Sequence, residues 1–287
     1  MKKLHDLFLA ALLCCGQASA EDEPEVIRPV TAAYTIEGGT THIADTYLSP
    51  IKYSGWNSSL RYERMQAMKF SPDKWVMRLA TSVSVQRALN YAGNSAMWYA
   101  GVDFSWGMMR RWQVVPGLTL AIGGEAAADL GALYSTRNGN NPVSAKAAVT
   151  IGATGYAAYN MKIGRLPVTF CWQPSLPVVG AFFSPDYGEL YYEIYLGDHN
   201  GLAHCAWWGN YFRLDNALTA DLHFGATSLR LGYRGSVLST KVNHLVSRHF
   251  THSAVIGVSG EWLSLNPRKG MSPKARIVNA LFQNQWK

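Results

Sequence analysis

Apolar and polar residues alternate along several segments of the chain. Within residues 95–106, 118–130 and 218–227, every second residue is mainly apolar, and the residues between are mainly Gly, Ser, Thr or charged. Residues 75–86 and 146–159 show the same alternation. Successive side chains of a β-strand point to opposite faces, so this period of two predicts strands with one apolar and one polar face. Less regular strand candidates lie at residues 56–68, 166–172, 189–197, 203–213, 229–238 and 249–263.

The composition decides between two kinds of β-protein. Of the 287 residues, 48% are hydrophobic and only 16% are charged, and ten are Trp. No stretch reaches the roughly 18 consecutive apolar residues that a membrane helix needs. A soluble β-sandwich would need a strongly charged outer face, whereas a membrane barrel turns its apolar face to lipid and its polar face to the lumen. The sequence therefore predicts an all-β, antiparallel transmembrane β-barrel.

The ends of the chain suggest how it is organised. Residues 1–20 have the basic, apolar and small-residue order of a cleaved signal peptide, so we expect export and an outer-membrane location. A strand with its connection takes roughly 22 residues, which predicts about twelve strands, with ten or fourteen as alternatives. We expect residues 21–55 to lead into the barrel, 56–265 to form it and 266–287 to form a tail. Ser272 and Pro273 favour a short helix in that tail.

Two cysteines remain after removal of the leader, Cys171 and Cys205. An oxidising compartment permits a disulfide between them. Two separate, small apolar side chains are an equally good interpretation.

Several short motifs resemble an uncharacterised outer-membrane β-barrel family of Bacteroides-type bacteria. They are residues 41–50 (THIADTYLSP), 53–55 (YSG), 183–188 (FSPDYG), 191–193 (YYE) and 229–234 (LRLGYR). The resemblance spans nearly the whole mature chain. It implies an outer-membrane barrel of unassigned function, and it carries over no catalytic residue.

Motifs for common cofactors are absent from the sequence. It contains no Gly-rich phosphate loop, no Cys-x-x-Cys and no His-Glu-x-x-His. Basic residues are scattered rather than clustered with aromatic residues, which argues against a nucleic-acid partner. We therefore expect no cofactor and no metal, and we expect outer-membrane lipids and a small-molecule solute as partners.

The polar strand faces supply candidate residues for a lumen. We single out Asp221, His223, Glu125 and Asp129 as lumen-facing candidates for ligand binding. Asp221 and His223 share a strand face, so the carboxylate could orient the imidazole for catalysis or simply form a structural hydrogen bond. Mixed charges predict a filled or restricted lumen. The expected lumen residues are Arg61, Glu63, Arg78, Asp103, Glu125, Asp129, Lys146, Asp221 and His223.

An enzyme would need a Ser and a His side by side near the membrane boundary. His249 and Ser253 share a strand face, but four residues of strand separate them by about 13 to 14 Å, too far for proton transfer. His42, Asp45 and Ser49 lie in the first family-like motif. That segment predicts either a plug or ligand contact, or a structured N-terminal connection.

Three functions remain open on the sequence alone. The first is a non-enzymatic outer-membrane barrel acting as a restricted pore, a binding protein or a structural element. The alternative is a lipid-processing enzyme of the phospholipase or lipid A hydrolase or acyltransferase type, with no catalytic residue assigned. A third is a soluble exported β-protein that binds carbohydrate through Trp and Tyr faces.

Overall fold

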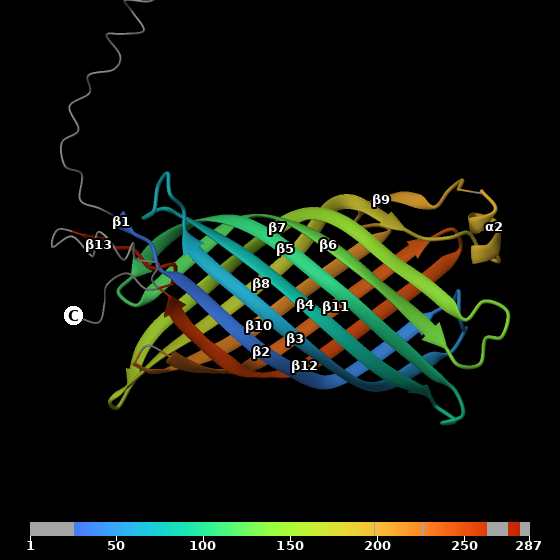
Figure 1. The fold of residues 1–287 in the computed structure, drawn as a ribbon, viewed down its shortest axis with the longest axis horizontal. Helices are drawn as coiled ribbons and strands as arrows, with labels where there is room; N and C mark the ends of the chain where they lie inside the picture. The colour runs from blue at the N-terminus through green and yellow to red at the C-terminus, as the bar shows by residue number, and fades with distance from the viewer. Residues whose placement is uncertain (1–25, 198, 226, 263–274, 282–287) are drawn as a thin grey trace, which may run out of the picture.

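The computed structural model describes residues 26–197, 199–225, 227–262 and 275–281 (Figure 1). The expected signal peptide at residues 1–20 lies outside this range. No helix within these residues is long and apolar enough to cross a membrane.

Ten long strands in the described part of the chain close into one antiparallel barrel (Figure 1). Each pairs with the next along the chain, β8 pairs with β10, and β12 pairs with β2 to complete the ring. The short β9 (Ala203–Trp207) lies outside the ring and pairs with the end of β8. The wall strands are β2 (Val30–Asp45), β3 (Lys52–Ala67), β4 (Trp75–Asn90), β5 (Ala96–Val115), β6 (Leu118–Ser135), β7 (Val143–Ile163), β8 (Leu166–Phe183), β10 (Tyr211–Phe224), β11 (Thr227–Val242) and β12 (Leu245–Trp262).

The antiparallel β-barrel is confirmed, but the expected number of about twelve strands is too high. The wall strands are 14 to 21 residues long, whereas crossing a bilayer takes only about 9 to 11 residues. Strands that continue past the apolar belt use up chain, so fewer of them fit.

The wall also begins earlier than the expected boundary at residue 56, because β2 is a full strand of the ring. Its centre is Gly38-Gly39-Thr40-Thr41, which has no apolar alternation. Gly39 is required by close packing, since a Cβ atom there would lie 2.0 Å from the His252 carbonyl oxygen on β12.

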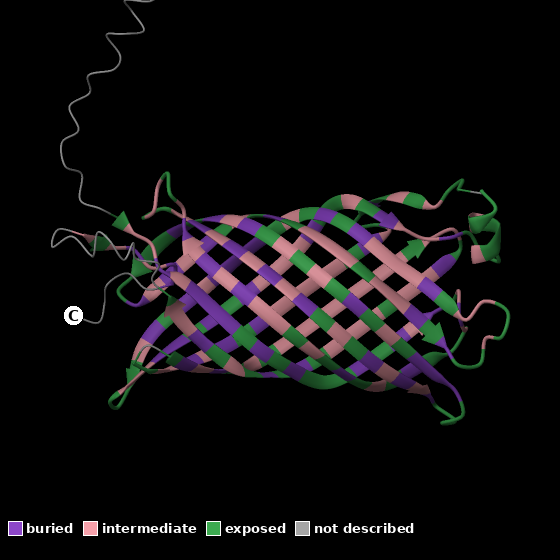
Figure 2. Cartoon of the chain, viewed as in Figure 1, coloured by how far each residue is buried: buried purple, intermediate pink, exposed green. Residues whose placement is uncertain are grey.

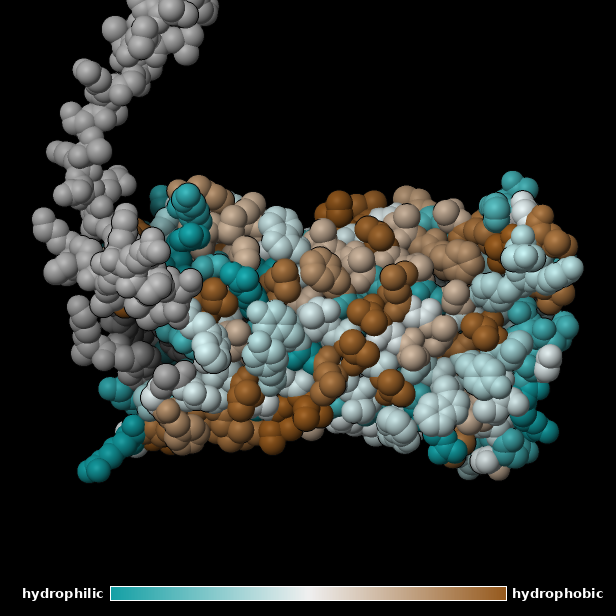
Figure 3. All heavy atoms as spheres, viewed as in Figure 1, coloured by the Kyte–Doolittle hydropathy of each residue, from teal (hydrophilic) through white to brown (hydrophobic). Residues whose placement is uncertain are grey.

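The alternation places apolar side chains outside and polar side chains inside. On β6, Ile122 and Leu130 are each 65% exposed on the outer surface, while Glu125 is buried in the lumen. Buried and exposed residues consequently alternate along each strand (Figure 2). Figure 3 shows hydrophobic side chains across the middle of the outer face, with hydrophilic ones gathered toward the two ends.

The two ends of the barrel differ. At the end that carries β1 (Val26–Ile27) and β13 (Arg276–Ile277), here the terminal end, Pro116 and Gly117 form a tight turn between β5 and β6, and residues 68–74 join β3 to β4. The longest connection lies at the opposite, loop end. Residues 136–142 join β6 to β7, and residues 184–202 join β8 to β9 and contain α2 (Tyr191–Tyr195).

The C-terminal segment enters the terminal end of the barrel as extended chain. β13 pairs in parallel with β1, and Ala280 and Leu281 are buried. Arg111 Nη1 donates to the carbonyl oxygens of Asn279 (2.5 Å) and Ala280 (2.7 Å). The predicted helix is wrong for residues 275–281. Their backbone is not helical, and the carbonyl oxygens of Asn279 and Ala280 accept hydrogen bonds from Arg111 instead of from backbone N–H groups of a helix. The rest of the predicted helix lies outside the described residues.

Candidate functional site

A buried ion network crosses the terminal half of the lumen. Arg78 donates to Glu63 (2.9 Å) on one side and to Glu125 (3.0 Å) on the other. Arg230 donates to both carboxylate oxygens of Asp221 (2.7 and 2.8 Å) and lies 3.4 Å from Glu63. These five residues come from β3, β4, β6, β10 and β11, so they join opposite sides of the wall. A buried charge is costly unless it is paired, so these side chains are held in place by one another. The layer that they form closes the lumen at this level.

A second ion network lies next to the first, toward the loop end. Arg213 on β10 reaches Asp103 (3.2 Å) and Asp129 across the lumen, and Asp215 (2.7 Å) on its own strand. Glu37 is paired with Arg61 and Arg234 at 3.3 and 2.9 Å.

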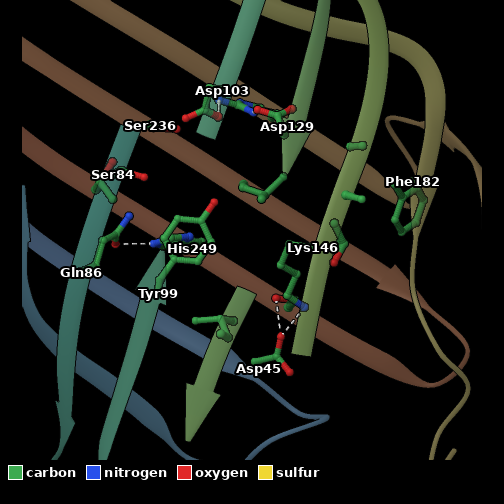
Figure 4. A pocket seen from close by; sticks show the side chains of 18 of the residues that line it. Asp45, Ser84, Gln86, Tyr99, Asp103, Asp129, Lys146, Phe182, Ser236 and His249 are labelled. Atoms are coloured by element: carbon green, nitrogen blue, oxygen red, sulfur yellow. Dashed lines mark hydrogen bonds and ion pairs between the residues drawn. The ribbon is translucent and has the colours of Figure 1, made fainter. Parts of the chain in front are cut away.

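Beyond the second network the lumen widens into a cavity of about 150 Å³ (Figure 4). Short polar side chains supply much of its wall, among them Ser84 and Ser236. Gln86 Oε1 accepts hydrogen bonds from Thr41 (2.6 Å) and from His249 Nε2 (2.6 Å). The aromatic lining residues are Tyr47, Tyr99, Phe182, Phe183 and Tyr211.

The loop side of the cavity is narrowed by contacts across the mouth. Lys146 on β7 donates to Asp45 on β2 (2.6 Å), on the opposite side of the ring. The Tyr47 hydroxyl donates to the Glu189 carbonyl oxygen (2.7 Å), and its ring packs edge-on against Tyr191 of α2. Burial raises the pKa of Tyr47 to about 12, so this hydroxyl stays a neutral donor at physiological pH.

The four singled-out residues occupy different places. Asp129 lines the cavity, whereas Asp221 and Glu125 belong to the ion network below it. His223 lies near the terminal end of β10, where its ring nitrogens bond Thr169 (2.8 Å) and Ser228 (2.6 Å). Asp221 accepts a hydrogen bond from Arg230 on each of its oxygens. The other expected lumen residues, Arg61, Glu63, Arg78, Asp103 and Lys146, all face the lumen.

The sequence-based search missed Arg213, Arg230, Arg234 and Glu37. The signal was present for Arg213, because extending the alternation of residues 218–227 back along the strand puts it on the same face as Asp221. The partners of each charge depend on register between strands that are distant in sequence, and that information is not local.

The histidines form pairs that their spacing did not predict. His249 and Ser253 bond different partners, Gln86 and Asn57. On the outer face near the loop end, His42 Nδ1 lies 2.9 Å from Ser54 Oγ. This pair forms because β2 and β3 are a hairpin that places residues 42 and 54 opposite one another.

The remaining candidate residues, Asp45, Ser49 and the two cysteines, do not form a catalytic or metal-binding arrangement within the described residues. Asp45 belongs to the barrel wall and the cavity, while Ser49 lies in the turn that follows β2. Cys171 and Cys205 are separate free thiols, the first buried and the second exposed. Within the described ranges, no group of three or more His, Cys, Asp or Glu side chains is arranged to hold a metal.

Comparison with known proteins identifies the family of the chain. The sequence profile of a family described as "Protein of unknown function (DUF3316)" matches residues 5–269. No curated protein matches the chain. The outer membrane protease OmpT from Escherichia coli is 7% identical with a TM-score of 0.46, covering 82% of this chain and 97% of OmpT. The translocator domain of the autotransporter NalP from Neisseria meningitidis is 11% identical with a TM-score of 0.36, covering 91% and 97%.

Proposed function

The chain belongs to this family of proteins of unknown function, and we propose that it is an outer-membrane barrel that binds a small, neutral polar solute in a lumen closed toward the terminal end. The expectation of an uncharacterised family is confirmed, while the outer-membrane character of that family and its assignment to Bacteroides-type bacteria stay predictions. The observation that carries the proposal is the cavity of about 150 Å³, which lies between the second ion network and the loops.

The outer-membrane location is supported by the outer surface of the wall. Large apolar side chains are exposed there on strand after strand, including Ile36, Leu60, Val83 and Leu130. A soluble protein rarely exposes a continuous apolar surface of this kind, whereas a barrel in lipid requires one. The same surface argues against the soluble carbohydrate-binding alternative.

Binding is a better proposal than conduction because the lumen is crossed at several levels. The ion network of Glu63, Arg78, Glu125, Asp221 and Arg230 spans the wall, and the C-terminal segment fills the terminal end. A solute could enter from the loop end and would meet a layer of paired, buried charges.

The lining indicates the class of solute. Five carboxylates and four Arg or Lys side chains border the cavity, so the charges nearly balance and a strongly charged solute gains little. Hydroxyl and amide groups alternate with aromatic rings, a combination that suits a polyhydroxylated ring such as a sugar. About 150 Å³ holds roughly ten waters, and therefore a ligand of about that many non-hydrogen atoms.

Calorimetric titration of the folded, detergent-solubilised protein tests this proposal. We expect neutral monosaccharides to bind and uronic acids of the same size to bind less. Ser84→Phe fills the cavity and should weaken binding by at least tenfold, whereas Val85→Phe on the lipid-facing side of β4 should not. Absence of saccharide binding at millimolar concentration, or equal binding by Ser84→Phe, would contradict the proposal.

A second candidate function is lipid hydrolysis or acyl transfer, and the outer-face Ser54–His42 pair favours it. The imidazole is close enough to accept the Ser54 proton. On its other side, however, His42 faces Phe250 of β12, where a catalytic His would need a carboxylate or amide to orient it. Mass spectrometry of phospholipid and lipid A after incubation tests it. Product formed by wild type and by Ser58→Ala, but lost in Ser54→Ala, would establish the enzyme, and unchanged lipid would exclude it.

A further inference from the structure

The outer face of the barrel carries a one-sided group of cations at the loop end. We name Lys52 on β3, Arg87 on β4, Lys241 on β11 and Arg248 on β12 the rim patch. Each lies within four residues of the loop end of its strand. Each also points outward, because the residues beside it along the strand are buried in the wall or line the cavity, as Gln86, Thr240 and His249 do.

The rim patch is continuous across neighbouring strands. Arg248 and Lys52 lie on either side of the same β2 residue, Ala44, and Lys241 is paired with Val246, two residues from Arg248. Neighbouring strands are about 4.8 Å apart, so the backbone positions of Lys52 and Lys241 each lie within about 10 Å of that of Arg248. Arg87 follows on the next strand beyond Lys52.

Carboxylates do not neutralise this patch from within the wall. Every Asp and Glu of the wall strands faces the lumen, where most are buried or paired with Arg213, Arg78 or Arg230. Among the described residues, none of the four rim-patch cations forms an ion pair with a carboxylate. The patch therefore presents unneutralised positive charge to whatever lies against the barrel.

The position of the rim patch along the barrel axis indicates which layer of the membrane surrounds it. Just below it the outer face is apolar, with Leu60 and Val83 more than half exposed. The Arg87 guanidinium rests over the Trp98 ring at 5.5 Å, and Trp98 packs edge-on against Trp56 at 6.3 Å. Exposed Trp residues above an apolar belt mark the level of lipid headgroups.

Among the wall strands, outward cations at this height are confined to one side of the barrel, and Arg137 in the connection after β6 donates to Asn94. The corresponding outward positions on β5, β6, β7 and β10 are Ala96, Tyr134, Val143 and Phe212, none of which is charged. Cations that merely anchor a barrel would be expected all round the rim. A cluster on β11, β12, β3 and β4, around β2, is instead suited to one bound molecule.

We infer that the rim patch binds the phosphate groups of a phosphorylated lipid in the outer leaflet, with its acyl chains against the apolar wall below. Arg87 is held by Trp98 in a plane that leaves guanidinium N–H groups free for phosphate oxygens. The loop end faces outward because outer-membrane barrels carry their longer connections on that side. The inference uses the outer-membrane location proposed above and is independent of the solute cavity.

Native mass spectrometry with two matched lipids tests the inference. The probes are diphosphorylated lipid A and the same lipid with both phosphates removed, each added to folded protein in detergent. Wild type should bind the phosphorylated form at least tenfold more tightly. Lys52→Gln/Arg87→Gln/Arg248→Gln should abolish that preference.

The control variant removes outward cations at the other end of the barrel. Arg64→Gln/Arg110→Gln is well matched, because Arg110 also rests over a Trp ring, that of Trp112, at 5.5 Å. This variant should keep the tenfold preference, and heat-modifiable gel mobility verifies that all three proteins are folded. Equal binding of the two lipids by wild type, or an equal loss in the control variant, would overturn the inference.

Discussion

The two halves of the lumen are built from the same strands and differ in the length of the side chains that point inward. Toward the terminal end, β11 contributes Arg230 and Arg234, whereas toward the loop end it contributes Ser236 and Thr240. β3 shows the same gradient, from Met65 and Glu63 toward the terminal end to Ser59 and Asn57 toward the loop end. Long side chains meet across the terminal half and close it, and short ones leave a cavity in the loop half. The position of a binding site in a barrel is therefore set by side-chain length along each strand as well as by strand number.

The largest contrast between the halves should appear on removing Arg78. Arg78→Ala leaves Glu63 and Glu125 buried without their shared partner, which should lower the free energy of unfolding by about 3 to 5 kcal/mol. Ser84→Ala in the cavity wall should change it by no more than about 0.5 kcal/mol. Equilibrium urea unfolding in detergent measures both, and similar values for the two variants would contradict the contrast.

A smaller but more local effect is expected at the terminal end. Arg111→Ala removes the hydrogen bonds to Asn279 and Ala280, so the C-terminal segment should leave the barrel more often. Limited proteolysis followed by intact mass spectrometry should show faster trimming of the C-terminus. The neighbouring Arg110 faces outward, and Arg110→Ala should be trimmed at the wild-type rate. Trimming of the two variants at the same rate would mean that Arg111 does not hold the segment.

The smallest effect is expected at the mouth of the cavity. Lys146 is partly exposed, and the buried Asp45 carboxylate also accepts hydrogen bonds from the Tyr47 backbone N–H and the Ser247 hydroxyl, so Lys146→Gln should cost only about 1 kcal/mol. The same variant should speed the entry of solute, because it releases a contact that crosses the mouth. Stopped-flow fluorescence would measure the entry rate, and a slower rate than wild type would show that the ion pair does not restrict entry.

The barrel could be predicted from the sequence because alternation with period two is a local property. Residues 118–130 give both the strand and its inward carboxylates, Glu125 and Asp129, without any knowledge of their neighbours. β2 was not predicted as a wall strand because the residues at its centre do not alternate between apolar and polar. Gly39 is needed there because the backbone of β12 lies too close for a Cβ atom. The hydrogen-bonded pair of Ser54 and His42 could not be found by counting residues, since it exists only once the hairpin register is known.

The cavity could not be predicted from the sequence either. Its walls come from both sides of the ring, for example from Asp45 on β2 and Lys146 on β7, which are 101 residues apart. A mixture of charges predicts a restricted lumen but does not say which half is filled. Only the pairing of Arg213 with Asp103 and Asp129 shows where the filled half begins.

Labelling of cysteines on one strand tests most directly whether the lumen is open to the loop end and closed toward the terminal end. Ser84 and Ala80 lie on the same face of β4, the first bordering the cavity and the second deeper in the barrel and buried. In a Cys171→Ala/Cys205→Ser background, a membrane-impermeant maleimide applied from the loop side should modify Ser84→Cys and spare Ala80→Cys. Equal modification of both would show a continuous aqueous channel and would contradict the account, as would protection of both.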